Sequence, residues 1–142
     1  MTNTVSLQTV RPGVFLAPLG VWVVMAVLAV ANGVTRETLI IPRVGDYPGH
    51  VLSTALLVVA ILAVAGLFFS WSSVDYSQIE LLAIGVGWTV MTVGFEFLVG
   101  YAEGTPVSVT VGQYDVLAGQ VWIAVPITLL LSPLMFGAWL AN

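Results

Sequence analysis

The sequence is organised around a polar stretch, NGVTRETLIIPRVGDYPGH, at residues 32–50. It contains two of the three arginines and the single histidine of the chain, and long apolar runs lie on both sides of it. The second half repeats this layout: an apolar run ends in Phe95-Glu96-Phe97, a polar link follows, and Asp115 opens the last apolar run. Each half is therefore predicted to consist of a helix, a polar link and a second helix.

The composition predicts an integral membrane protein. Of the 142 residues, 59% are hydrophobic and 7% are charged, whereas soluble domains carry about 25% charged residues. So few charges cannot solvate a globular surface, and lipid must be the main solvent. Each spanning helix needs roughly 20 apolar residues, so we expect one all-α domain (1–142) in the cell membrane, with multiple passes. The expected architecture is an up-down-up-down bundle of four transmembrane helices at about 14–34, 49–71, 79–101 and 114–140.

Several classes of function are disfavoured by residue usage. The absence of cysteine excludes disulfides, thiolate nucleophiles and cysteine metal sites. Three arginines, no lysine and a net charge of −4 argue against a nucleic-acid partner. No Ser/His/Asp signature, phosphate loop or dinucleotide fingerprint is present, so no cofactor is expected and no catalytic residue can be assigned. Metal is not expected either, because the His, Asp and Glu residues lack Glu-x-x-His or His-x-x-x-His spacing, although their ligand types suit zinc or iron.

The predicted topology gathers the ionisable residues at two ends of the bundle. In four antiparallel helices, the end of the first, the start of the second, the end of the third and the start of the fourth lie on one membrane side. Those places hold Arg36, Glu37, His50, Glu96 and Asp115, whereas Arg11, Asp75 and Glu80 belong to the opposite side. The chain is therefore expected to be polarised along the membrane normal.

Helical periodicity turns small and polar residues of different helices toward a common axis. On the third helix Gly85, Thr89, Thr92 and Glu96 share one face, because they are spaced at i, i+4, i+7 and i+11. On the first helix, a similar stripe consists of Ala26, Ala29, Gly33 and Arg36. We therefore expect a polar pocket that binds a small molecule or lipid head group. Its candidate residues are Asn32, Arg36, Glu37, His50, Ser53, Thr92, Glu96, Tyr101, Asp115 and Trp122.

Local signals predict how the helices are linked. Residues 35–48 are expected to form a link, because Pro42, Gly45 and Pro48 break helices. The alternation of apolar and polar residues at 107–111 is compatible with a short extended segment. The five tryptophans are expected to lie mostly at the membrane interface.

Three classes of function remain open. The first is binding or passage of a small molecule, ion or lipid head group. The second is an intramembrane enzyme that uses Glu96 or His50 as acid or base, and the third is a structural or accessory subunit without a site. A cavity lined by the polar residues favours the first two classes. The depth of Glu96 in the membrane predicts that its carboxylate pairs with Arg36, or with His50 in its charged form. A fully packed ion pair between Arg36 and Glu96 favours the third class.

A set of spaced positions resembles a family of small bacterial and archaeal four-helix membrane proteins that has no assigned function. The resemblance covers about residues 30–125 and implies the same fold. In relatives a histidine often stands where this chain has Tyr101, and an arginine often stands at Gln120; these departures weaken a two-histidine metal site and a second anion contact here. The matching pattern is Asn32-Gly33-x-x-Arg36-Glu37, Pro42, Gly45, Gly49-His50, Ser53, Phe95-Glu96-Phe97-x-x-Gly100 and Tyr114-Asp115-x-x-Ala118-Gly119-x-x-Trp122.

Overall fold

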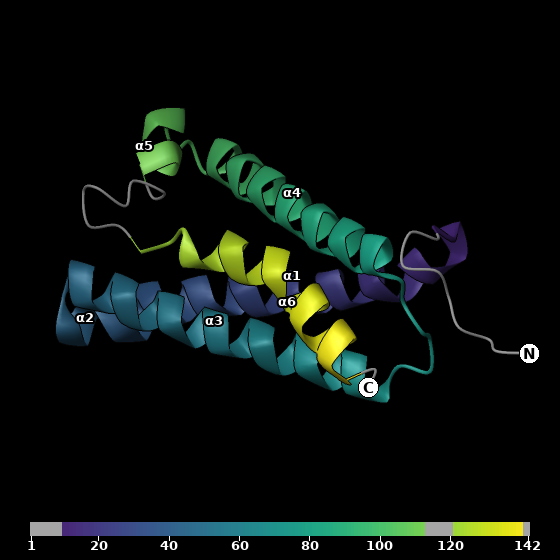
Figure 1. Ribbon diagram of the computed structural model, residues 1–142. Helices are drawn as coiled ribbons and strands as arrows, with labels where there is room; N and C mark the ends of the chain where they lie inside the picture. The colour runs from purple at the N-terminus through teal and green to yellow at the C-terminus, as the bar shows by residue number, and fades with distance from the viewer. Residues whose placement is uncertain (1–9, 113–120, 141–142) are drawn as a thin grey trace, which may run out of the picture.

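The computed structural model describes residues 10–112 and 121–140, and these residues form helices and connecting turns without a strand (Figure 1). The order of elements is a 3₁₀ turn η1 (Pro12–Phe15), α1 (Leu16–Thr35), a π-helical turn η2 (Arg36–Ile40), α2 (Ile41–Val44), α3 (Asp46–Trp71), α4 (Gln78–Ala102), α5 (Val107–Gly112) and α6 (Ala124–Leu140). The expectation of an all-α fold is confirmed for this part of the chain.

Three helical segments are long and apolar enough to cross a membrane: Pro12–Val44, Asp46–Trp71 and Gln78–Ala102. Their outer faces carry exposed aliphatic side chains such as Val27, Val59 and Val90, each more than 60% exposed. Apolar surface of this extent is stable in lipid and not in water. The expectations of a multi-pass membrane protein and of a lipid-bilayer environment are confirmed at this level.

The fourth apolar helix is shorter in the described residues than the sequence predicts. Helix α6 has 17 residues, which at about 1.5 Å per residue gives roughly 25 Å, against about 30 Å of hydrocarbon. It begins at Ala124, so the predicted start near residue 114 is not observed, and residues 113–120 lie outside the described part of the chain.

The prediction of a link at residues 35–48 is wrong, because the helix continues through most of it. Helix α1 passes into η2 and then α2, and Gly45 alone separates α2 from α3. Pro42 lacks an N–H and its ring clashes with the carbonyl four residues earlier. A π-helical turn, in which the Ile41 N–H donates to the Arg36 carbonyl, accommodates this defect. Gly45 has a φ of +93°, which glycine adopts without steric cost, and there the chain reverses.

The expected extended segment at 107–111 is also helical. It forms the short helix α5, and its Thr110 side chain is 5% exposed. A Cβ at Gly100 would lie 3.1 Å from the Thr110 hydroxyl oxygen, so α5 packs closely against the end of α4. Packing of Thr110 against Gly100 stabilises this short helix, and the alternation of apolar and polar residues over five positions does not predict that contact.

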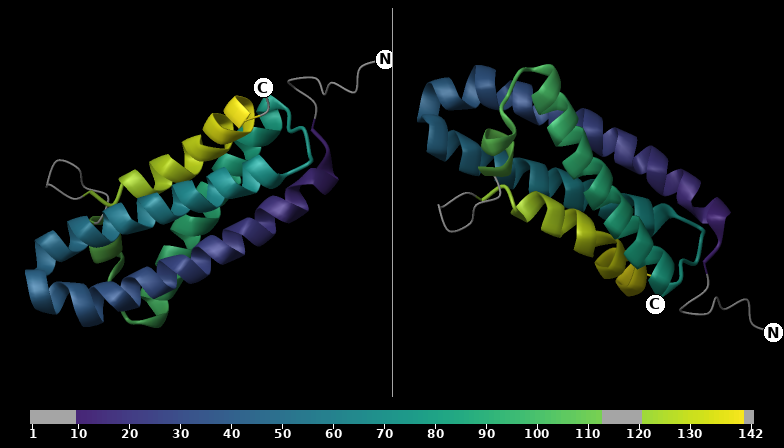
Figure 2. Two further views of the ribbon diagram at one scale, coloured as in Figure 1. Left: turned by 90° about the horizontal axis from the view of Figure 1, so that it is seen from below. Right: turned by 90° about the horizontal axis from the view of Figure 1, so that it is seen from above.

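The helices pack unevenly, and this leaves a gap at one end. Helix α6 packs against both α3 and α4, and α3 packs against α1. Helices α1 and α4 touch near the start of α1, where the Trp88 indole N–H donates to the Pro18 carbonyl at 2.9 Å. From there α4 rises away from α1 toward the end that carries α2 and α5 (Figure 1), and it crosses α1 when the molecule is seen from above or below (Figure 2).

The opposite end is closed by an ion pair whose carboxylate is buried. The Glu80 side chain is 0% exposed, and its two carboxylate oxygens accept from the Arg11 Nη2 at 2.6 Å and Nε at 2.9 Å. The same carboxylate accepts from the backbone N–H of Ser77, and the Ser77 hydroxyl accepts from the Glu80 N–H, which completes a capping box at the start of α4. This pair joins the start of the described chain to α4.

Candidate functional site: a cleft between α1 and α4

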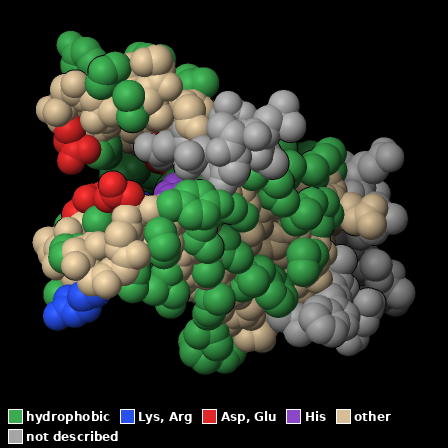
Figure 3. Space-filling view, turned by 90° about the vertical axis from the view of Figure 1, so that its left-hand side faces the viewer, with side chains coloured by type: hydrophobic (Ala, Val, Ile, Leu, Met, Phe, Trp, Pro, Cys, Tyr) green, Lys and Arg blue, Asp and Glu red, His purple; other side chains and the backbone are tan. Residues whose placement is uncertain are grey.

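A cavity of about 550 Å³ occupies the gap between α1 and α4, with side chains of α3 and α6 forming its floor. Figure 3 shows the cleft from the end that carries α2 and α5, between an upper and a lower lobe of the molecule. This volume lies within the range of about 300–1,000 Å³ that is typical of ligand pockets. Hereafter this space is called the α1–α4 cavity.

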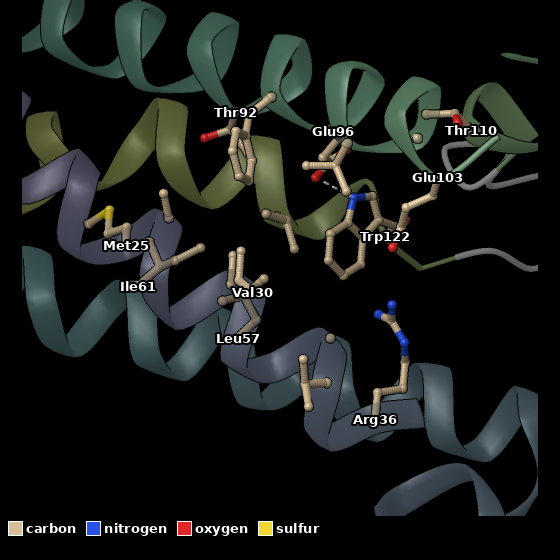
Figure 4. Close-up of a pocket in the computed structure, with 18 of the residues that line it drawn as sticks. Met25, Val30, Arg36, Leu57, Ile61, Thr92, Glu96, Glu103, Thr110 and Trp122 are labelled. Atoms are coloured by element: carbon tan, nitrogen blue, oxygen red, sulfur yellow. Dashed lines mark hydrogen bonds between the residues drawn. The ribbon is translucent and has the colours of Figure 1, made fainter. Parts of the chain in front are cut away.

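The inner part of the α1–α4 cavity is apolar. Leu57 and Ile61 of α3 are 2% and 3% exposed, and they present one face of that helix to the cavity. Met25 of α1 also lines this part (Figure 4). Val125 and Leu129 of α6 complete this part. Such a surface binds hydrocarbon and gives no polar recognition.

The mouth of the cavity is charged. Arg36 comes from η2, and Glu96 and Glu103 come from α4 and the residue that follows it. Glu37 also lines the mouth, and its side chain is 65% exposed. Figure 3 shows acidic side chains on both sides of the cleft. The cavity therefore passes from a charged mouth to an apolar interior.

Trp122 lies between the two charges that the sequence predicts to pair. Its indole N–H donates to Glu96 Oε1 at 2.8 Å. The Arg36 guanidinium carbon lies 5.9 Å from the centre of the Trp122 ring, within reach of a cation–π interaction (Figure 4). The ion pair that the structure gives Arg36 is with Glu37, at 3.4 Å. The predicted direct pair of Arg36 with Glu96 is thus replaced by a connection through the indole ring.

The two predicted stripes face the interior as the periodicity indicates. On α1, Ala26, Ala29, Gly33 and Arg36 all line the cavity. On α4, the Thr92 hydroxyl accepts from the Trp22 indole N–H at 2.9 Å, which ties α4 to α1 at the inner end of the cavity. Thr89 lies one turn earlier and donates to the Gly85 carbonyl at 2.7 Å.

Asn32 and Ser53 connect helices and do not line the cavity. The Ser53 hydroxyl donates to the Asn32 side-chain oxygen at 2.6 Å, and the Asn32 amide donates to the Ser53 carbonyl at 2.9 Å. Ser53 is 0% exposed. This reciprocal pair joins α1 to α3 behind the site, so both residues support its geometry.

The remaining predicted site residues have different positions. The His50 ring lies 6.2 Å from the Trp122 ring, centre to centre, so it supports Trp122 from the side of α3. Tyr101 is 84% exposed, so its prediction as a pocket residue is wrong. It follows Glu96 by five residues, which turns its side chain about 140° around the helix. Asp115 lies outside the described residues.

Several lining residues were not predicted. Glu103 and Thr110 follow the third long apolar run, where no helical period connects them to the stripe. Trp22 extends the α1 stripe by one step, at i−4 from Ala26, so the periodicity could have identified it. The expectation of a mostly interfacial tryptophan belt fits Trp71, which is 79% exposed, but not Trp88, which is 1% exposed in the core.

No family profile, curated protein or solved structure matches this chain. Within residues 10–112 and 121–140, no three His, Asp or Glu side chains are grouped so that they could share a metal ion. The chemistry of the site therefore has to be inferred from its geometry.

Proposed function

We propose that this protein spans the cell membrane four times and binds an amphipathic small molecule or lipid in the α1–α4 cavity. The observation that carries this proposal is the change in polarity along the cavity. Its inner end is built from nearly buried aliphatic side chains, and its mouth carries Arg36, Glu96 and Glu103. An amphiphile with its chain inward and its polar group at the mouth matches both ends.

The fourth span is proposed from the packing of α6. This helix lies against α3 and α4 along its length, and residues 124–137 are apolar. A helix of roughly 25 Å in such a position needs few additional residues to cross the hydrocarbon. Antiparallel connection of α1, α3, α4 and α6 then places the cavity mouth at one membrane surface.

The arrangement favours binding over the other two classes of function. A purely structural role predicts a packed ion pair between Arg36 and Glu96, and the structure has a cavity and an intervening indole ring there. An acid–base enzyme that uses Glu96 and His50 needs the two groups to reach one reacting centre. Trp122 contacts both groups, and its indole N–H already donates to Glu96 Oε1.

Filling the cavity with a larger side chain should weaken binding several-fold. Ala29 lines the cavity from α1, so the ring of Ala29→Phe would occupy the space of a bound chain. We expect the wild-type protein, purified in mild detergent and extracted for mass spectrometry, to retain a near-stoichiometric amphiphile. The Ala29→Phe protein should retain several-fold less.

The matched control is Ala31→Phe on the same helix. Ala31 is exposed and does not line the cavity, so the same addition there should leave the retained amphiphile unchanged. Equal retention by the wild type and by Ala29→Phe would mean that the amphiphile binds elsewhere. Retention of a purely hydrophilic compound would contradict the proposed orientation.

A further inference from the structure

The two walls at the mouth of the α1–α4 cavity differ in charge, because one carries Arg36 with its ion-pair partner Glu37 and the only charged groups that the other carries among the described residues are carboxylates. Arg36 extends from the wall formed by α1 and η2, and Glu96 and Glu103 extend from the wall formed by α4 and its end (Figure 4). Trp122 lies between the walls. Its indole N–H donates a hydrogen bond to Glu96, and its ring faces the Arg36 guanidinium. A ligand at this position meets the Arg36 guanidinium from the wall of α1 and η2, and the carboxylates of Glu96 and Glu103 from the wall of α4.

Most N–H donors of the Arg36 guanidinium are available to a ligand. It has five N–H donors, and within the described residues its hydrogen bonding consists of one long contact, 3.4 Å from Nε to Glu37. Its side chain is 25% exposed and lines the cavity. A planar guanidinium with free N–H groups binds a phosphate through two parallel hydrogen bonds, which an ammonium cannot do.

The carboxylates at the mouth disfavour binding of a purely anionic head group. Glu37, Glu96 and Glu103 line the mouth together with Arg36, so the lining residues that the structure describes carry three negative charges against one positive charge. A phosphate without a compensating cation would be repelled by this excess. A purely cationic group would leave the guanidinium donors without an acceptor. A head group that carries an anion and a cation can bind the guanidinium with the one and the carboxylates with the other.

Resting on the proposed function, we infer that the ligand is a phospholipid with a zwitterionic head group that carries a phosphate and a primary ammonium. The phosphate binds Arg36, and the ammonium binds at the α4 wall, with Glu103 as its main partner and Glu96 deeper in the cavity. An acyl chain passes over Trp122 into the apolar interior that Leu57 and Ile61 line. Phosphatidylethanolamine has this chemistry.

Native mass spectrometry in detergent tests this inference with three lipids of identical chains: phosphatidylethanolamine, phosphatidylcholine and phosphatidylglycerol. We expect the ethanolamine lipid to bind about tenfold more tightly than the glycerol lipid, a difference typical of one charge-assisted contact. Arg36→Gln should weaken binding of all three lipids about tenfold, because each carries a phosphate. Glu103→Gln should reduce or reverse the preference for the ethanolamine lipid over the glycerol lipid.

Two matched controls separate the site from general surface charge. Arg43 and Asp46 lie near the same end of the molecule, are exposed and do not line the cavity. Arg43→Gln and Asp46→Asn should therefore leave the affinities and the preference unchanged.

The outcomes distinguish the head-group inference from the proposed function. Equal affinities for the ethanolamine and glycerol lipids, or a preference for the glycerol lipid, would overturn the inference while the cavity still binds lipid. Binding of glycerophosphoethanolamine, which lacks chains, as tightly as the intact lipid would also overturn it. If no lipid binds to the wild type and Ala29→Phe changes nothing, both proposals fail.

Discussion

Gly85→Ala should destabilise the protein by about 1–3 kcal/mol, the usual cost of inserting a methyl group into a tightly packed interface. A Cβ at Gly85 would overlap the carbonyl oxygen of Leu130 on α6 and lie 3.3 Å from the Leu130 Cα. Backbone atoms cannot move aside as a side chain can, so α4 and α6 would have to separate. Unfolding in mild detergent by titration with dodecyl sulfate, followed by circular dichroism, measures the change.

The control for this prediction lies two residues away on the same helix. A Cβ at Gly87 would meet no atom within 4 Å, so Gly87→Ala removes a glycine from a helix without creating a clash. We expect it to be neutral or to stabilise the protein by up to about 1 kcal/mol, the difference in helix propensity. If Gly85→Ala unfolds no earlier than Gly87→Ala, the close contact between α4 and α6 is wrong, and so is the floor of the cavity that α6 supplies.

Glu80→Ala should cost about 2–3 kcal/mol. The substitution removes a buried carboxylate that binds Arg11 and completes the capping box with Ser77. The cost is lower than the about 3–5 kcal/mol of breaking a fully buried pair, because the Arg11 side chain is 36% exposed and water can replace part of the contact. The same unfolding titration measures it.

A double-mutant cycle assigns that cost to the ion pair. Arg11→Ala should also destabilise the protein, because it leaves the Glu80 carboxylate buried without its cation, and the double variant should lose less than the sum of the two. Asp75→Ala is the control: its backbone carbonyl accepts from Arg11, whereas its exposed side chain is dispensable. Strict additivity of the two substitutions would show that Arg11 and Glu80 do not interact.

Hydropathy and periodicity predicted the parts of this fold that depend on local sequence. The long apolar runs predicted α1, α3 and α4, and the predicted ends of α3 and α4 lie within three residues of the observed ends. The spacing of Ala26, Ala29 and Gly33 predicted the face of α1 that lines the cavity. Both inferences hold because lipid exposure and close helix packing constrain residue types directly.

The features that were missed depend on contacts between distant residues or on backbone detail. Arg11 and Glu80 are 69 positions apart, and no local pattern pairs them, although the Ser77-x-x-Glu80 capping box is visible in the sequence. Pro42 indicated a helix end, but a π-helical turn let the helix continue. The opposite charges of Arg36 and Glu96 suggested a direct ion pair. The sequence does not show that the Trp122 ring, 26 positions after Glu96, lies between them.

The most direct measurement of the central claim is photo-crosslinking from Met25. This side chain is 4% exposed and lines the apolar interior of the α1–α4 cavity, whereas Met135 is 50% exposed on α6. Photo-methionine can replace methionine during expression, and illumination of the purified protein followed by peptide mapping identifies any adduct. We predict an adduct at Met25 with the mass of an amphiphile, which Ala29→Phe reduces and Ala31→Phe does not. Adducts at Met135 with none at Met25 would contradict a ligand in the cavity.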